Sequence, residues 1–495
     1  MSHTKQHTNF ICNLAAKPSR LNHVWEHMVG SGHALLALRA DWQVQLKKAH
    51  DELGFSYVRF HGILDDDVGT LTCQEDKLIY SFFNSDQILD FLLSIGMKPF
   101  VELSFMPLAL ASGDATVFKY KGNVTPPRDY SSWETLIKRL VNHWVERYGV
   151  NEVRQWFFEV WNEPNLKAFW VAEQADYFKL YKHTVRAIKS IDSKLKVGGP
   201  ATAKNAWITD FLVFCASNDL PADFVSTHHY PTDAFGQPGD DTETQLSKSH
   251  RSVLREEACE TYLQAQNKPV YYTEWCTSSN PFDILHDESY AAAFIIKTNM
   301  EAVGLMQGYS YWTFSDIFEE NYFSSVPFHG GFGLLNIHGI AKPAYRAYQL
   351  LRQLGTDQLP VEGSHTTVDV WVVRRKNDIM VLATNWGLPR HHIRSESIFL
   401  SLNHSNPPFS VDITRIDSEN ANAKSAWIAM GEPEYLSAEQ IRHLHAASEL
   451  KSHDLPYEFV DNTIILRFIL PPQSVVSLNL KFQPFHAAPF IPQKT

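Results

Sequence analysis

Two glutamates stand at the ends of apolar segments that have the character of buried strands, each close to a tryptophan. Glu163 belongs to the sequence WNEPN at 161–165, and Glu274 belongs to YTEW at 272–275. Carboxylates at the ends of two parallel strands meet at one edge of a sheet, where one can protonate a leaving oxygen while the other attacks the carbon that bears it. The pair therefore indicates cleavage of a glycosidic bond.

The chain between about residues 51 and 316 alternates amphipathic helical segments with short apolar runs, which is typical of β/α units and a parallel sheet. Eight strands are predicted, the number that closes a (β/α)₈ TIM barrel. In this count Glu163 ends the fourth strand and Glu274 ends the seventh. The predicted strands lie within 25–38 and at 57–60, 99–103, 156–160, 196–198, 224–227, 269–273 and 309–314.

Polar residues ahead of two helical segments predict where those helices begin. Ser85 or Asp86 is expected to cap the helix that precedes the third strand. Ser131 and Glu134 have the spacing of a capping box for the helix that precedes the fourth strand.

The sequence changes character beyond Pro343, where short alternating segments replace the helix and strand pattern. Residues 368–372 and 379–382 flank a turn and predict a hairpin, with further strands at 409–413, 464–470 and 476–482. A helix that opens with a capping box of Ser437 and Gln440 interrupts them. We expect the α/β barrel at 14–345, an appended C-terminal β-sandwich domain at 346–482, to which residues 1–13 could add, and a tail at 483–495.

The composition of the 495-residue chain is that of an ordinary globular protein, with 44% hydrophobic and 20% charged residues. Its formal net charge of −11 would repel nucleic acid and an anionic membrane surface, so neither is an expected partner. The N-terminal residues lack the apolar core of a secretory signal, and no window approaches the roughly 20 apolar residues of a membrane span, which favours a cytoplasmic protein. The five scattered cysteines have no Cys-x-x-Cys spacing and are expected to be reduced.

Over nearly its whole length the chain resembles glycoside hydrolase family 39, the family of β-xylosidases and α-L-iduronidases. The resemblance implies the barrel with its sandwich, and a retaining mechanism with Glu163 as general acid/base and Glu274 as nucleophile. In such a mechanism the charge of Glu274 keeps the proton on Glu163 until the glycosyl-enzyme forms. Besides WNEPN and YTEW, the motifs that carry it are FHG at 60–62, DDD at 65–67, HWVERYG at 143–149, YWTFSD at 311–316, EE at 319–320 and FHGGFGL at 328–334.

The resemblance also implies a set of sugar-binding residues at the same strand ends. Asn162 would donate a hydrogen bond to the sugar 2-hydroxyl, and Trp312 would be either a platform under the ring or a barrel-core residue. Glu319 and Glu320 would accept hydrogen bonds from sugar hydroxyls and would repel a uronate, which favours a neutral pentose such as xylose. The remaining members are His61 after strand two, and His228 and Tyr230 after strand six.

Cys276 departs from the family pattern, which usually has asparagine after the Glu-Trp pair, and we expect a small buried residue without a catalytic role. No cofactor is implied. No metal site is expected either, because the run Asp65-Asp66-Asp67 lacks the spaced ligands of a calcium loop and is interpreted as a hydrogen-bonded or solvated turn.

These features favour a retaining, exo-acting β-xylosidase that releases xylose from the non-reducing ends of short xylo-oligosaccharides by double displacement. One alternative is another retaining glycosidase of this barrel type, acting on arabinosides, glucosides or iduronides. A second alternative is a non-catalytic carbohydrate-binding barrel, against which the intact pair Glu163 and Glu274 argues. A homo-oligomer is left open, since the proline-containing tail at 484–495 would either pack on a neighbouring subunit or be mobile.

Overall fold

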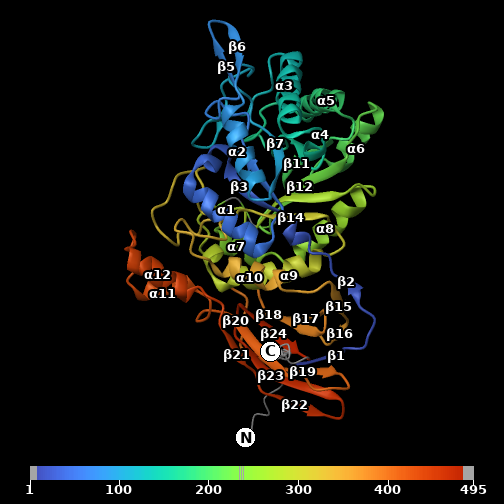
Figure 1. Ribbon diagram of the computed structural model, residues 1–495, viewed down its shortest axis with the longest axis vertical. Coiled ribbons are helices and arrows are strands. Elements are labelled where there is room, and N and C mark those ends of the chain that lie inside the picture. Colours follow the sequence, from blue (N-terminus) through green and yellow to red (C-terminus); the bar gives the residue numbers. More distant parts are fainter. Residues whose placement is uncertain (1–7, 234, 236, 238, 483–495) are drawn as a thin grey trace, which may run out of the picture.

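Eight parallel strands close into a barrel in the order β10-β11-β12-β13-β14-β3-β4-β7 (Figure 1). The computed structural model describes residues 8–482 except 234, 236 and 238. The barrel confirms the predicted fold class, and the first strand, expected within 25–38, is β3. The barrel strands are β3 (Met28–His33), β4 (Tyr57–His61), β7 (Lys98–Leu103), β10 (Phe157–Val160), β11 (Lys196–Thr202), β12 (Phe224–His229), β13 (Val270–Trp275) and β14 (Gly308–Tyr311).

Helices surround the barrel (Figure 1), and several of them, including α3, α5 and α10, are amphipathic with one buried face. In α3 the buried side chains recur every three or four residues, from Trp133 to Trp144. The helices are α1 (Ala40–Leu53), α2 (Phe83–Ser94), α3 (Tyr130–Tyr148), α4 (Val150–Val153), α5 (Gln174–Ile191), α6 (Ile208–Ser217), α7 (Thr242–Ser247), α8 (Val253–Gln264), α9 (Ser289–Ala302) and α10 (Pro343–Arg352), with short 3₁₀ turns η1 (Val24–Glu26), η2 (Ala34–Leu38), η3 (Ala203–Asn205) and η4 (Ile284–Asp287).

Both predicted caps in the barrel domain are wrong. Helix α3 begins at Tyr130, and its cap is Asp129, whose carboxylate accepts from the backbone N–H groups of Ser131 and Ser132 at 3.2 and 2.9 Å. Asp129 thus takes the Ser131 N–H, the donor that the proposed capping box would have paired with the Glu134 side chain. Helix α2 begins at Phe83 without a side-chain cap.

The residues expected to cap α2 lie inside its first turn, where other partners engage them. The Ser85 hydroxyl donates to the backbone oxygen of Phe82 at 2.9 Å. The Asp86 carboxylate lies 2.9 Å from Nε2 of His143 on α3. A tertiary contact therefore uses the carboxylate that the sequence pattern assigned to the helix terminus.

The barrel interior changes from apolar to charged along the strands. Inward-facing residues alternate along a strand, so Phe100 and Phe157 pair near the start of β7 and β10, and Glu102 and Glu159 pair two residues later. The first layer is a plug of aromatic rings, with Phe100 and Phe157 stacked at 4.9 Å. The carboxylates of the next layer are completely buried. The plug closes one end of the barrel, and the charged layer forms the floor of its other end.

A β-sandwich of a 5-stranded and a 7-stranded sheet follows the barrel, as predicted. Its larger sheet packs against α9 and α10 (Figure 1). The smaller sheet has the order β16-β1-β19-β23-β22 and the larger β2-β15-β17-β18-β24-β20-β21. The strands are β1 (Thr8–Asn13), β2 (Ser19–Arg20), β15 (Asp357–Leu359), β16 (Val361–Glu362), β17 (Val368–Arg375), β18 (Asp378–Asn385), β19 (Glu396–Asn403), β20 (Ser410–Ile416), β21 (Ser452–Asp454), β22 (Tyr457–Val460), β23 (Thr463–Leu470) and β24 (Ser474–Lys481).

Two helices, α11 (Ala423–Ala429) and α12 (Ala438–Ala447), leave the sandwich between β20 and β21 and extend to the barrel rim. Ser437 and Gln440 form the predicted capping box of α12. Trp427 packs on Phe328 of the barrel with ring centroids 5.6 Å apart. The expected domain boundary at 345/346 lies within α10, whose buried face belongs to the barrel core. The predicted tail lies outside the described residues.

Two hairpins stand in the loops of the barrel, β5 (Leu71–Gln74) with β6 (Lys77–Tyr80) and β8 (Thr116–Val117) with β9 (Gly122–Asn123). Among the described residues, the helices are all too short or too polar to cross a membrane.

A buried lysine fixes the long segment that follows β14. Nζ of Lys342 lies 2.6 Å from Asp287 and 2.6 Å from Asp316, and all three side chains are fully buried. The two carboxylates in turn accept from the backbone N–H groups of Gly330 and Gly333, each at 2.7 Å. The segment after β14 carries Glu319 and Glu320 over the barrel mouth. This cluster fixes the part of that segment that leads back from the mouth to α10.

Replacing Lys342 with alanine should lower the free energy of unfolding by about 3–5 kcal/mol, because two buried carboxylates lose their counter-charge. Denaturant unfolding followed by tryptophan fluorescence measures the loss. Lys167→Ala is the matched control, since its ion pair with Glu173 is exposed, and should cost less than about 1 kcal/mol. Equal losses in the two variants would contradict a special role of the buried cluster.

Candidate active site

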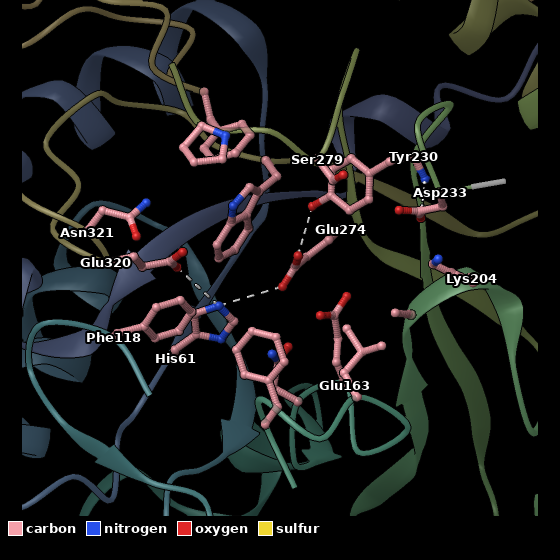
Figure 2. A pocket seen from close by; sticks show the side chains of 17 residues that line it. His61, Phe118, Glu163, Lys204, Tyr230, Asp233, Glu274, Ser279, Glu320 and Asn321 are labelled. Atoms are coloured by element: carbon pink, nitrogen blue, oxygen red, sulfur yellow. Dashed lines mark hydrogen bonds and ion pairs between the residues drawn. The ribbon is translucent and has the colours of Figure 1, made fainter. Parts of the chain in front are cut away.

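A cavity of about 340 Å³ opens at the C-terminal ends of the barrel strands, and Figure 2 shows the side chains that line it. Most of the residues proposed from the sequence gather here. His228 and Glu319 are exceptions, since neither side chain lines the cavity. The lining residues are His61, Phe118, Asn162, Glu163, Leu166, Phe169, Ala203, Lys204, Tyr230, Asp233, Glu274, Ser279, Pro281, Trp312, Glu320, Asn321 and Phe332.

Glu163 and Glu274 face each other across this cavity, with carboxylate oxygens within 4.8 Å. That spacing is close to the roughly 5 Å of retaining glycosidases and shorter than the 6.5 Å or more that inverting enzymes need to fit a water molecule. Glu163 follows β10 in a left-handed conformation, with φ of 41°. Its backbone N–H donates to the oxygen of Ala201 on the next strand at 2.7 Å, which fixes this strained turn.

Local register shifts aim the side chains of the facing strands. In the pairing of β12 with β13 the register shifts between Thr227 and His228, so that His228 lies beside Glu274. Bulges of this kind redirect side chains next to active sites. As a result His228 places Nδ1 at 2.9 Å from Glu163 and 3.6 Å from Glu274.

Glu274 is held by two hydrogen-bond donors. Arg59 donates from Nη1 to one carboxylate oxygen at 2.8 Å, and the Tyr230 hydroxyl donates to the other at 2.9 Å. Charge-assisted donors of this kind favour the ionised carboxylate and fix its orientation. The arrangement leaves Glu274 anionic and pointing at the cavity.

Arg59 was missed by the sequence analysis, although a charged residue within a predicted buried strand was a visible signal. Its guanidinium is completely buried and reaches Glu274, Glu159 and Glu102 at 2.6–2.8 Å. It also donates to Oδ1 of Asn162 at 2.9 Å. Because the Asn162 oxygen is engaged, its amide N–H₂ is the end available to a ligand.

Glu163 is almost fully buried, and burial raises its pKa to about 7. The positive charges of His61 and Arg59 oppose this shift without cancelling it. The retained proton was predicted to depend on the charge of Glu274, whereas desolvation is the largest cause in the structure. A carboxyl group with this pKa can serve as a general acid near neutral pH.

One wall of the cavity consists of His61, Glu320, Trp312 and Phe118 (Figure 2). Burial opposes the charged form of His61, but Glu102 at 2.7 Å and Glu320 at 3.4 Å raise its pKa to about 10. Trp312 lies 4.9 Å from the His61 ring. Burial raises the pKa of Glu320 to about 7. His61, Trp312 and Glu320 of this wall are buried, and the wall offers both donors and acceptors to hydroxyl groups.

Glu319 does not share this wall, in contrast to the expectation that both glutamates face the sugar. Its carboxylate lies 3.0 Å from Nδ1 of His33, whose Nε2 lies 3.2 Å from Asp65 and 3.3 Å from Asp67. Burial opposes protonation of His33, but the hydrogen bonds to these carboxylates raise its pKa to about 11. The four side chains form a cluster of close charged contacts around a buried imidazole ring. Asp65 also accepts from the Phe105 N–H at 2.9 Å, as expected for a hydrogen-bonded turn.

The opposite wall carries Lys204 after β11 and Asp233 after β12, neither of which was predicted. Burial and the nearby charge of Glu163 raise the pKa of Asp233 to about 8. In the sequence, only their position in loops that follow predicted strands pointed to a place in the site.

Glu163, His228 and Glu274 bring possible ligand atoms within 4.8 Å of one another, a distance that a metal ion could span. Both ring nitrogens of His228 already have hydrogen-bond partners, Glu163 at 2.9 Å and Thr273 at 3.0 Å. We therefore describe the group as a hydrogen-bond network. Cys276 is fully buried behind Glu274, outside the cavity lining.

The chain is similar to known glycosyl hydrolases in both sequence and overall structure. The family model for glycosyl hydrolases family 39 matches residues 12–459. The chain is 50% identical to a β-xylosidase of Caldicellulosiruptor saccharolyticus over 95% of its length and 97% of that protein, and 39% identical to a β-xylosidase of Geobacillus stearothermophilus over 86% of each. The crystal structure of a family 39 enzyme from Xanthomonas axonopodis pv. citri superimposes with a TM-score of 0.86 at 34% identity, covering 97% of this chain and 98% of that one. The chain therefore belongs to glycosyl hydrolases family 39.

Proposed function

We propose that the protein is a retaining, exo-acting β-xylosidase that releases xylose from the non-reducing ends of xylo-oligosaccharides. The observation that carries this proposal is the pair Glu163 and Glu274, with oxygens within 4.8 Å, one carboxyl group protonated by burial and the other held ionised by Arg59. The 50% and 39% identical relatives named β-xylosidases support the choice of sugar.

In the first step the proton of Glu163 passes to the glycosidic oxygen as the bond from that oxygen to the anomeric carbon breaks. A carboxylate oxygen of Glu274 forms a bond to the same carbon, which gives a covalent glycosyl-enzyme. The N–H₂ group of Asn162 donates to the 2-hydroxyl, an interaction that strengthens as positive charge develops on the sugar. The rest of the substrate leaves with the proton from Glu163.

In the second step Glu163 acts as the base. It takes a proton from water as the water oxygen attacks the anomeric carbon, and the bond to Glu274 breaks. Xylose leaves with the configuration of the substrate, and Glu163 is protonated again. Arg59 and Tyr230 then hold the regenerated carboxylate of Glu274.

The wall that contains His61, Trp312 and Glu320 suits the terminal sugar. His61, Trp312 and Glu320 are at most 9% exposed, so a ring between them is surrounded, which fits exo action. His61 and Glu320 form an ion pair at 3.4 Å, and both can offer hydrogen bonds to hydroxyl groups. The two cations of this half, Arg59 and His61, are already paired with carboxylates, which supports a neutral pentose over a uronate.

The opposite wall, which carries Lys204 and Asp233, suits the leaving group. The general acid must lie between the sugar that stays and the sugar that departs, because it protonates the oxygen that joins them. Lys204 is exposed and Asp233 half-buried, on the side of Glu163 away from His61 and Glu320 (Figure 2). Their polar ends are placed to bind hydroxyl groups of the second xylose.

We further propose a cytoplasmic site of action. All five cysteines are free thiols, as is usual for proteins of reducing compartments.

Replacing Glu274 with alanine should reduce kcat on an aryl β-xyloside by at least about 10⁴-fold, because no covalent intermediate can form. For Glu163→Ala, added azide should restore turnover of an activated aryl β-xyloside and give a β-xylosyl azide, identified by NMR. Aryl β-glucoside, α-arabinoside and α-iduronide test the sugar. Preference of the wild-type enzyme for any of these over the xyloside would contradict the proposed substrate.

The kcat/KM for xylobiose should fall about tenfold per pH unit above pH 7, because Glu163 must be protonated in the free enzyme and burial raises its pKa to about 7. A dinitrophenyl xyloside, whose leaving group needs no proton, is the control and should lack most of this decline. An alkaline limb that begins above pH 9 on xylobiose would contradict the assignment.

Replacing Lys204 with alanine should reduce kcat/KM for xylobiose about 10-fold or more relative to the loss on an aryl β-xyloside, because a lost charged hydrogen bond costs roughly 1.5–3 kcal/mol and an aryl group has no hydroxyl to receive it. Lys194→Ala is the matched control, an exposed lysine near the opposite end of β11. Parallel losses on both substrates would place Lys204 outside the leaving-group site.

A further inference from the structure

A chain of four buried side chains leads away from the general acid. Oε1 of Glu163 lies 2.9 Å from Nδ1 of His228, and Nε2 of His228 lies 3.0 Å from the hydroxyl oxygen of Thr273. That hydroxyl donates to Oε1 of Glu159 at 2.8 Å. Nε of Arg59 donates to the other Glu159 oxygen at 2.6 Å. His228, Thr273, Glu159 and Arg59 are completely buried, so the protons on these four side chains must be assigned among the partners within the chain.

The direction of the hydrogen bonds in this chain of side chains follows from Glu159, whose ionised form is favoured. Glu159 is paired with a guanidinium, which favours its ionised form, and an ionised carboxylate only accepts hydrogen bonds. Thr273 has one hydroxyl proton, so that proton points at Glu159. The Thr273 oxygen must then accept from His228, which places a proton on Nε2.

His228 has no second proton to offer. Burial lowers its pKa to about 4, so the ring is neutral near pH 7 and carries one N–H. With that proton on Nε2, Nδ1 presents a lone pair to Glu163. Two facing lone pairs at 2.9 Å would repel each other, so the contact is a hydrogen bond only when Glu163 carries the proton.

We propose that Thr273 and Glu159 act as positioning residues that hold His228 in the Nε2–H tautomer, so that its Nδ1 accepts from Glu163 and keeps the general acid protonated in the free enzyme. This inference rests on the proposed role of Glu163. The same lone pair faces Glu163 in the glycosyl-enzyme, where it disfavours the anion and makes Glu163 a stronger base toward water.

Other ionisable groups also act on Glu163, and the test must separate their effect from that of the tautomer. The groups facing it are Arg59 and His61 of β4, Glu102 of β7, Lys204 after β11, Tyr230 and Asp233 after β12, Glu274 of β13 and Glu320 after β14. A change at Thr273 that preserves charge leaves all of them in place.

The experiment compares Thr273→Val with Thr273→Ser in the full-length enzyme. Valine has nearly the shape of threonine but cannot accept from Nε2–H, so the His228 proton moves to Nδ1 and donates to the Glu163 carboxylate. We expect the alkaline pKa of kcat/KM on xylobiose to fall by about one unit, the equivalent of one hydrogen bond. Serine keeps the hydroxyl and should hold that pKa within a few tenths of the wild-type value.

An unchanged alkaline pKa in Thr273→Val, or equal shifts in the two variants, would overturn the inference. The nitrogen-15 spectrum of wild-type enzyme with labelled histidine gives a second, independent readout, with the His228 signals identified by their loss in His228→Gln. A protonated Nδ1 and an unprotonated Nε2 at pH 6 would overturn the inference even if the valine variant fails to fold. Failure of azide to rescue Glu163→Ala would instead refute the proposed function.

Discussion

One buried guanidinium organises the reacting end of the barrel. Arg59 extends from β4 into the interior and meets carboxylates from β7, β10 and β13, three strands that the chain reaches much later. Removing a charge from water is costly, and a buried arginine is stable only where its hydrogen bonds are satisfied. The need to satisfy Arg59 thus fixes the orientation of Glu274 and of the Asn162 amide, which are the groups that a substrate must meet.

The two catalytic candidates owe their different states to their surroundings. Glu274 has a guanidinium and a phenol donating to it, and its carboxylate is stabilised as an anion. Glu163 has the lone pair of a neutral imidazole beside it and little access to water, and its neutral form is favoured. Two chemically identical side chains within 4.8 Å are therefore suited to the different roles of acid and nucleophile that we propose for them.

The surrounding structure limits the access of water to these carboxylates and holds their neighbours in place. The aromatic plug below the charged layer excludes water from one end of the barrel. The lysine cluster of Lys342 anchors the segment after β14, from which Glu320 reaches His61. The helices α11 and α12 of the sandwich pack on that same segment through Phe328. The second domain therefore stabilises the rim of the site.

The sequence by itself determined the barrel, the sandwich, and the places of Glu163 and Glu274 at strand ends, because hydrophobic periodicity and the spacing of strands are local properties of the chain. It did not determine the caps of α2 and α3, where nearby side chains compete for the same donors and a contact with His143 engages Asp86. Nor did it separate Glu319 from Glu320, since adjacent residues point in different directions and only the folded loop shows that one meets His33 and the other His61. The positions of Arg59, Lys204, Asp233 and Thr273 relative to the two glutamates were likewise decided by tertiary structure alone, because proximity across strands and the direction of a hydrogen-bond chain depend on residues far apart in the sequence.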